Sequence, residues 1–252
     1  MSFELNNLQN DSPTENDIII YWLGGAGFVF KFHDGSTICI DPYLSDAAER
    51  LFGFKRLSKA PIKADQLHFD VLLLTHEHVD HLDIDSFKDL TKANPDCRML
   101  ASESCVQYLG HENISYESVS PGISYTFGCT KIKAVPADHG DLCPDAVGFL
   151  ISFEERVLYF TGDTAYNENF MAEAIEQKPE IVIPCMNGAY GNMNERQAAL
   201  LVKKCNAKVA IPSHFGLFDE HGGDADRFAE CVESESPNTI VHILNPGQGI
   251  EV

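Results

Sequence analysis

The stretch Val71-Leu-Leu-Leu-Thr-His-Glu-His-Val-Asp-His-Leu-Asp83 joins an apolar run to a dense group of metal-ligand residue types. Residues 71–74 are all apolar and predict a buried strand. Four residues of ligand type follow within six positions: His76, His78, Asp80 and His81. Side chains two residues apart in an extended chain point the same way, about 6–7 Å apart at the backbone, so His76 and His78 can converge on one ion. Asp80 and His81 come where the chain must turn toward a helix, so they face a second point nearby.

A metal ion explains this stretch better than two alternatives. Burying three histidines and an aspartate together without a cation costs a large free energy. A polar loop with coincidental histidines is the simpler alternative. A helical zinc-protease signature would need a second histidine at position 80 after His76-Glu77, where the chain has Asp80. The stretch therefore predicts a metal site at the end of a strand.

Composition narrows the class of protein and of partner. The 252 residues are enough for a sizeable core, and 44% apolar with 22% charged residues is ordinary for a globular α/β protein. The 38 acidic residues against 18 basic ones give a formal charge of −20, which repels polyanions. We therefore expect a small-molecule substrate, and neither nucleic acid nor a membrane, as the partner. The oligomeric state is left open, a homo-oligomer included.

Compartment and domain organisation follow from the termini and the cysteines. Residues 1–16 form a polar lead-in without a cationic, apolar leader, and we expect a single domain over 17–252. No apolar run approaches a membrane span. The eight cysteines are scattered without a C-x-x-C pair, as in a reducing compartment. These features predict a cytoplasmic protein.

Local periodicity predicts an alternation of strands and helices along the chain. Besides 71–74, the expected strands are 17–23, 28–32, 37–40, 97–101, 114–119, 130–136, 147–153, 156–160, 181–184, 208–212 and 239–244. The expected helices are 84–93, 103–109, 168–177, 194–204 and 224–235. The glycines at 24–27 lack a following helix and a G-K-S/T, so they indicate a tight turn rather than a phosphate loop. The connection 43–69 has no clean period, and a connection of that length is usually functional, often a lid.

Four separate expected strands end in ligand-type residues. The cluster at 76–81 follows one strand, and His139, Asp163 and His214 each follow another. Binding sites of α/β folds collect where strand ends meet loops. The other histidines, at 33, 68, 111, 221 and 242, lack this context and are expected at the surface or in turns, with 221 the most ambiguous. The strand ends therefore predict one shared site.

This order of motifs resembles the metallo-β-lactamase superfamily. The pattern His-x-His-x-Asp-His, a later His, a Gly-Asp and a final His spans residues 17–244. The segments Asp41-Pro-Tyr-Leu-Ser-Asp46, Phe160-Thr-Gly-Asp-Thr164, Asn187-Gly188 with Gly191-Asn-Met-Asn194, and Ser213-His214 look like the L-ascorbate-6-phosphate lactonase branch. The resemblance implies an αββα four-layer sandwich. It also implies His76, His78 and His139 on one metal, Asp80, His81 and His214 on another, and Asp163 bridging both.

Two adjacent divalent ions would suit hydrolysis of an ester or lactone. Water held between them loses its proton near neutral pH, and Asp80 can orient the resulting hydroxide and carry its proton. All expected ligands are nitrogen or oxygen, which fits zinc, manganese and iron. The lactonase branch is associated with manganese and the wider superfamily with zinc. Candidate substrate contacts are Tyr43, Ser45, Arg56, Asn187, Asn192 and Asn194, of which Arg56 could meet a phosphate and Asn194 has a rival role as a helix cap.

Three functions are consistent with this pattern. The first is a metal-dependent hydrolase that opens the lactone ring of a sugar acid, phosphorylated as in L-ascorbate 6-phosphate. The second is a phosphodiesterase of the same fold, disfavoured for nucleic acid by the charge of −20. The third is a non-catalytic regulator that binds a metabolite, which a complete ligand set disfavours.

Overall fold

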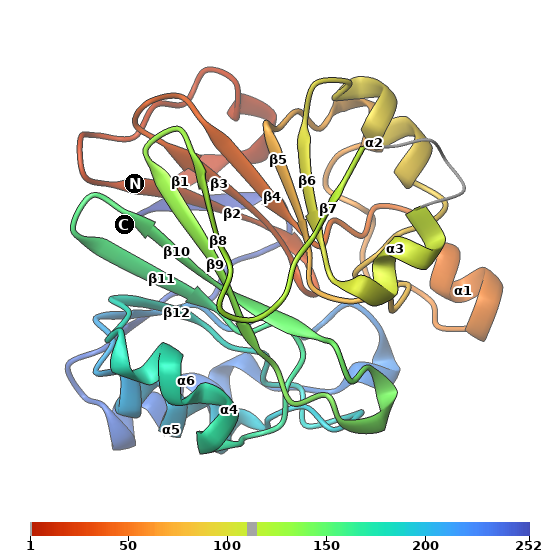
Figure 1. Ribbon diagram of the computed structural model, residues 1–252. Helices are drawn as coiled ribbons and strands as arrows, with labels where there is room; N and C mark the ends of the chain where they lie inside the picture. Colours follow the sequence, from red (N-terminus) through yellow and green to blue (C-terminus); the bar gives the residue numbers. More distant parts are fainter. Residues whose placement is uncertain (1, 110–114) are drawn as a thin grey trace. The chain divides into compact units, whose positions relative to one another are not determined.

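The computed structural model describes residues 2–109 and 115–252, and the chain divides into two compact units (Figure 1). The first unit comprises Met1–Val119, Leu217–Asp219 and Leu244–Val252, and the second comprises Ser120–Gly216 and Glu220–Ile243. Each unit contains one mixed β-sheet and its own helices. No helix of the described residues is long and apolar enough to span a membrane.

The first unit is built on an eight-stranded sheet in the order β1-β15-β2-β3-β4-β5-β6-β7. Its strands are β1 (Ser2–Glu4), β2 (Ile18–Gly24), β3 (Gly27–Phe32), β4 (Thr37–Ile40), β5 (Val71–Leu74), β6 (Arg98–Ala101), β7 (Glu117–Ser118) and β15 (Gln248–Glu251). Strands β4 to β7 run parallel, and the other neighbours are antiparallel. Because β4 and β5 are parallel neighbours, the residues that follow them emerge at the same edge of the sheet.

Helices α2 (Phe87–Ala93) and α3 (Glu103–Leu109) cover one face of this sheet. Tyr21 of β2 and Leu72 of β5 belong to the same buried cluster as Leu90 of α2. The connection between β4 and β5 contains α1 (Ala47–Phe52) and the short helix η2 (Ala64–Gln66), and η1 (Leu5–Asn7) follows β1.

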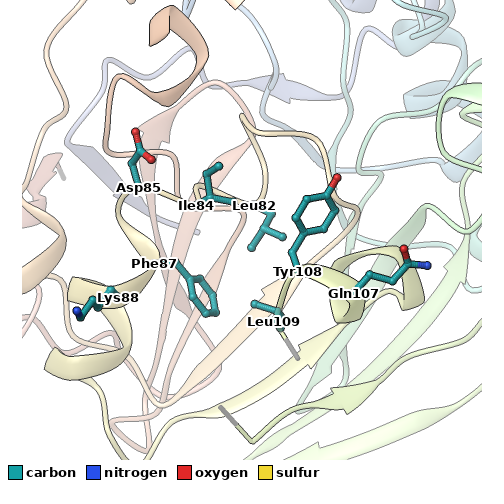
Figure 2. A pocket seen from close by; sticks show the side chains of 8 residues that line it. All are labelled: Leu82, Ile84, Asp85, Phe87, Lys88, Gln107, Tyr108 and Leu109. Atoms are coloured by element: carbon teal, nitrogen blue, oxygen red, sulfur yellow. The ribbon is translucent and has the colours of Figure 1, made fainter. Parts of the chain in front are cut away.

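A hollow of about 800 Å³ lies beside α2 and α3, where Figure 2 shows mostly apolar side chains around it. It is lined by Leu82, Ile84, Asp85, Phe87, Lys88, Gln107, Tyr108 and Leu109. Leu82, Phe87 and Leu109 also belong to the buried cluster of this unit. The hollow is therefore the outer side of the core, and none of the expected site residues lines it.

The second unit is built on a seven-stranded sheet in the order β14-β13-β12-β11-β10-β9-β8. Its strands are β8 (Ser124–Phe127), β9 (Thr130–Pro136), β10 (Val147–Phe153), β11 (Arg156–Phe160), β12 (Ile181–Ile183), β13 (Val209–Ala210) and β14 (Ile240–Val241). Strands β11 to β14 run parallel, whereas β8 to β11 are antiparallel neighbours. Strands β9 and β11 are both antiparallel to β10, so they too point the same way.

Figure 1 shows α4 (Glu168–Glu176), α5 (Glu195–Cys205) and α6 (Ala225–Glu235) gathered on one side of this sheet. Tyr159 of β11 and Val182 of β12 share a buried cluster with Met171, Val202 and Phe228 of the three helices. Short helices η3 (Gly140–Leu142) and η4 (Asp219–His221) follow His139 and His214.

Several expected boundaries were wrong. The helix expected at 84–93 begins only at Phe87, after Ser86 as its N-cap. The chain does not close with a strand at 239–244: β14 covers two residues there, and β15 is the last strand. The expected strand 114–119 is observed only at β7, and residue 114, like His111, lies outside the described residues.

The polar lead-in also contains structure that polarity alone did not indicate. Strand β1 pairs with β15, and Leu5 and Leu8 are buried in the core of the first unit. The start of the chain is therefore part of the sheet, apart from residue 1, which lies outside the described residues. A single folding domain over 17–252 stays a prediction.

Candidate functional site

The first group of expected ligands lies directly after β5, in the first unit. His76 and His81 are fully buried, whereas His78 and Asp80 are partly exposed. The Nε2 atom of His76 lies 2.9 Å from Nδ1 of His78, and Nε2 of His81 lies 3.6 Å from Oδ2 of Asp80. The ring centroids of His76 and His81 are 4.0 Å apart. The chain therefore brings all four predicted side chains of this stretch together.

Asp41, the residue after β4, accepts hydrogen bonds from this group and from Thr75 beside it. Its Oδ2 lies 2.7 Å from Nδ1 of His81 and accepts a 2.5 Å hydrogen bond from the Thr75 hydroxyl. Its Oδ1 accepts the Thr75 backbone N–H at 2.9 Å. Because a carboxylate only accepts, His81 donates through Nδ1 and leaves Nε2 for a ligand bond. Asp41 is fully buried and holds a left-handed φ of 43°, a conformation rare for a residue with a side chain.

The second group of expected ligands lies in the second unit, after β9, β11 and β13. His139, Asp163 and His214 are all buried. Oδ2 of Asp163 lies 3.2 Å from Nε2 of His214 and 3.9 Å from Nε2 of His139. These strands share a direction, so their carboxyl ends deliver the three side chains to one edge of this sheet. His214 also has a left-handed φ, of 61°.

The three asparagines expected to contact substrate each form a hydrogen bond within the second unit. Asn192 donates from Nδ2 to Oδ2 of Asp163 at 2.8 Å. Asn187 donates to the backbone carbonyl of His221 at 3.3 Å. Asn194 forms a capping box with Gln197 at the start of α5, with both hydrogen bonds at 3.0 Å. The capping role of Asn194 is therefore confirmed, and substrate contact by the three asparagines stays a prediction.

The three candidates of the long connection hold that connection in place. The Tyr43 hydroxyl accepts from the Ala48 N–H at 2.9 Å, and burial raises the pKa of this phenol to about 12. The Ser45 hydroxyl donates to Oδ1 of Asp83 at 2.5 Å. Arg56 donates to the carbonyls of Tyr43 and Ser58, and burial lowers the pKa of its guanidinium. Contact of these side chains with substrate stays a prediction.

Both groups of ligands suit a divalent ion. Two ligands at about 2.1 Å from a tetrahedral ion are roughly 3.4 Å apart, near the separations of 2.9 and 3.2 Å within the two groups. Imidazole and carboxylate donors accept zinc, manganese or iron. Residues able to hold a metal in the described parts of the chain include His76, His78, Asp80 and His81 of the first unit and His139, Asp163 and His214 of the second.

Family comparison agrees with this chemistry. The family model described as "Beta-lactamase superfamily domain" matches residues 36–215, which is more than half of the chain. The chain belongs to the metallo-β-lactamase superfamily. The superfamily relatives include a "UPF0173 metal-dependent hydrolase" of Caldivirga maquilingensis, 26% identical over 90% of this chain and 94% of its own length. Another protein of that description, from Methanopyrus kandleri, is 29% identical over 92% of this chain and 99% of its own length.

Solved structures confirm the fold expected of this superfamily. The metallo hydrolase Igni18 of Ignicoccus hospitalis superimposes with a TM-score of 0.74 at 21% identity, covering 94% of this chain and 99% of its own. The metallo-beta-lactamase fold protein YhfI of Bacillus subtilis does so with a TM-score of 0.71 at 17% identity, covering 94% and 100%. The expected metallo-β-lactamase fold is therefore confirmed, with two mixed sheets and their helices in this chain.

The sequence analysis did not predict that three further residues lie beside the candidate ligands. Asp41 is named in the sequence only within the segment 41–46 and without a role, although its position directly after an expected strand is a usable signal. Asp83 accepts from the N–H groups of Leu44 and Ser45, which local patterns do not reveal. His221 was expected at the surface or in a turn, but it is buried and stacks on His214.

Proposed function

We propose that this chain is a metal-dependent hydrolase that opens the lactone ring of a sugar acid, preferring a phosphorylated form such as L-ascorbate 6-phosphate. The observation that carries the proposal is the ligand chemistry at the strand ends. His76, His81, His139, Asp163 and His214 are buried, and buried donors of these types need a cation to offset their desolvation. The superfamily membership supports hydrolysis, and the resemblance of segments 41–46 and 187–194 supports the lactone.

We further propose that seven side chains hold two divalent ions, zinc or manganese with iron as an alternative. His76, His78 and His139 would bind one ion, Asp80, His81 and His214 the other, and Asp163 both. When bound, such ions supply the Lewis acidity that activates water near neutral pH and polarises a carbonyl group. Seven ligands exceed what one tetrahedral ion needs.

The residues of the chain then orient water and move protons. Asp80 is partly exposed and lies 3.6 Å from His81, so its carboxylate can accept a proton from an attacking water and pass it to the departing ring oxygen. Asp41 restrains His81 through Nδ1 and excludes the wrong tautomer. The products of ring opening are a carboxylate and a hydroxyl on one molecule.

A phosphate on the substrate needs a cationic contact in a strongly acidic protein. The sequence suggests Arg56 for this contact, but two of its guanidinium nitrogens already donate to backbone carbonyls. Lys55 and Lys59 line the same pocket of about 410 Å³ as Arg56, together with Asp46 and Glu49. We therefore include both lysines with Arg56 as candidates for the phosphate contact.

A substrate panel tests the proposal. The protein, loaded with Mn²⁺ or Zn²⁺, is assayed on hexonolactones with and without a phosphate, on simple esters and on bis-p-nitrophenyl phosphate. We expect lactone opening, with kcat/KM roughly ten- to a hundredfold higher for the phosphorylated lactone, as one charged hydrogen bond of about 1.5–3 kcal/mol predicts.

Each other outcome points to a different function. Equal kcat/KM for the two lactones would remove the phosphate preference. Rapid phosphodiester cleavage without lactone opening would favour the phosphodiesterase. No turnover by metal-loaded protein, together with tight binding of a sugar lactone, would favour the metabolite-binding regulator.

A further inference from the structure

We infer that Asn192 and His221 are positioning residues, which hold the ligands Asp163 and His214 in a metal-binding geometry before any ion arrives. The inference rests on the proposed metal-dependent function. It concerns the second unit alone, where all four residues are buried. Neither side chain is needed as a metal ligand in this role.

Asn192 fixes the carboxylate of Asp163. Its Nδ2 donates to Oδ2 of Asp163 at 2.8 Å, and only 7% of the asparagine is exposed. A hydrogen bond from an amide to a buried carboxylate is stronger than one between neutral groups, and it restricts rotation of the carboxylate. Oδ2 is also the Asp163 atom that approaches both His214 and His139, so the hydrogen bond acts on the atom where the ligands converge.

The backbone around Asn192 keeps the amide in this position. The Met193 N–H donates to the carbonyl of Thr164, the residue after Asp163, at 2.9 Å. The Asn192 N–H donates to the Ala189 carbonyl at 3.0 Å, which closes a turn. Gly188 and Gly191 take left-handed φ values of 67° and 83°, which favour glycine. The segment is therefore tied to the chain on which Asp163 lies.

His221 supports His214 from the face of its ring. The two imidazole rings are stacked, with centroids 4.5 Å apart and planes inclined by 23°. The His221 backbone carbonyl accepts from Nδ2 of Asn187, which joins this loop to the segment that carries Asn192. A stacked neighbour restricts rotation of the His214 ring. The backbone of His214 takes a left-handed φ, a conformation that persists where the surrounding contacts determine it.

The two glycines after His221 are closely packed. A Cβ added at Gly223 would lie 3.0 Å from Cβ of Phe215 and 3.1 Å from Cα of Asn187. Gly222 and Gly223 both take left-handed φ values. These contacts fix the loop that follows His221 against Asn187 and Phe215.

Metal affinity measured against stability tests the inference. Dissociation constants for Zn²⁺ and Mn²⁺ are obtained by competition with a chromophoric chelator, and thermal unfolding is followed in the metal-free protein. Removal of a partner that orients a ligand usually costs 10–100-fold in metal affinity. We expect Kd to rise by about that factor in Asn192→Ala and in the near-isosteric Asn192→Leu, and in His221→Ala. His221→Phe keeps an aromatic ring on His214, so its Kd should stay near that of the wild type.

Asn194→Ala is the matched control, because Asn194 lies in the same segment and its side chain caps α5 through Gln197. It should lower the melting temperature of the metal-free protein and leave Kd unchanged. Wild-type Kd in both Asn192 variants would overturn the inference, as would an equal rise of Kd in Asn194→Ala. Wild-type protein that binds no metal would instead overturn the proposed function, and this inference with it.

Discussion

At the scale of single residues, each of the two groups of candidate ligands has a residue with a strained backbone in it or beside it. Asp41 and His214 are both non-glycine residues at left-handed φ values. Such conformations cost about 1–3 kcal/mol each and persist where the surroundings determine them. Asp41 is held by two hydrogen bonds from Thr75 and one from His81. Backbone strain and buried hydrogen bonds thus occur together near the candidate metal ligands.

The first prediction concerns Asp41→Asn. The substitution keeps the shape but places an amide N–H₂ group against donors, because both carboxylate oxygens of Asp41 already accept hydrogen bonds. We expect metal affinity to fall roughly 10–100-fold and the free energy of unfolding to fall by about 1–3 kcal/mol. Chelator competition and urea unfolding measure the two effects, with the exposed Asp65→Asn as the control. Unchanged metal affinity would exclude the orienting role of Asp41.

The second prediction concerns Asp80→Asn. The amide keeps the size of the side chain but cannot accept a proton, so kcat on the lactone should fall by at least ~10². With metal at saturating concentration, the unfolding free energy should change less than the activation free energy, because Asp80 is only partly buried and the other proposed ligands remain. Steady-state kinetics and thermal unfolding check both statements. Hydrolysis by the variant at close to the wild-type rate would show that another group carries the proton.

At the scale of elements, the parallel strands of each sheet bring distant residues together. Asp41 and His81 are 40 positions apart, yet the register of β4 and β5 places them in contact. In the second unit, Glu180 joins three strands in the same way. Its side chain pairs with Arg156 of β11 at 2.7 Å and with Lys208, just before β13, at 2.9 Å.

The third prediction is the pH dependence of that ion-pair network. Partial burial would raise the pKa of Glu180, but Lys208 and Arg156 outweigh it and lower the pKa below its ordinary value. A lowered folded-state pKa contributes stability above the unfolded-state pKa, near 4.3, which is lost as pH falls through the folded-state value. Glu180→Gln should therefore lower the unfolding free energy by about 0.5–1 kcal/mol at pH 7 and by progressively less below pH 4.

Urea unfolding of chelator-treated protein between pH 3 and pH 7 measures this dependence. Glu155→Gln, at an exposed position in the turn between β10 and β11, is the control and should leave the curve unchanged. If Glu180→Gln lowers the free energy of unfolding by the same amount at every pH in this range, lost packing rather than a lost charge is the cause.

At the scale of the whole molecule, charge and metal act on stability together. The formal charge of −20 produces repulsion among acidic residues, and bound divalent cations reduce it. Buried ligands such as His76 and Asp163 carry a desolvation cost that an ion offsets. Both effects predict that the metal-free protein is folded less stably than the loaded one.

The fourth prediction is the metal content and its contribution to stability. We expect two divalent ions per chain by elemental analysis after purification without chelator. Free metal at a hundred times its Kd should stabilise the protein by about 2.7 kcal/mol per independent site. Thermal unfolding with and without EDTA, followed by addition of Zn²⁺ or Mn²⁺, measures the gain. One ion per chain, with no increase on reconstitution, would contradict the two-metal site.

The fifth prediction concerns salt. Raising the NaCl concentration from 10 to 100 mM shortens the Debye length from about 30 Å to about 10 Å, which screens repulsion among the acidic residues. The melting temperature of chelator-treated protein should therefore rise at pH 7. The rise should vanish near the sequence pI of about 4.7, where the net charge is close to zero. An equal rise at both pH values would indicate a general salt effect.

The sequence alone determined the parts of this protein that depend on local patterns. The apolar run 71–74 is β5, and the expected strands at 130–136, 147–153 and 156–160 coincide with β9, β10 and β11. When every second residue of a strand, or every residue, is buried, apolar residues form a pattern that can be recognised in the sequence. The ligand residues were visible for a related reason, because they come shortly after the ends of expected strands. Segments with few buried residues or of short length were missed: β8 has only exposed and half-buried residues, and α1 has six residues.

Only the tertiary structure decided which side chains meet. Nothing near Asp41 in the sequence indicates that His81 and Thr75 donate to it, and Asn192 gave no sign of binding Asp163, 29 positions away. Tyr43, Ser45 and Arg56 were expected to face substrate, yet each has a partner within the fold. Periodicity reports how deeply a residue is buried and not what it touches. Contacts across parallel strands depend on register and on the loops that follow, which form only when the whole sheet is assembled.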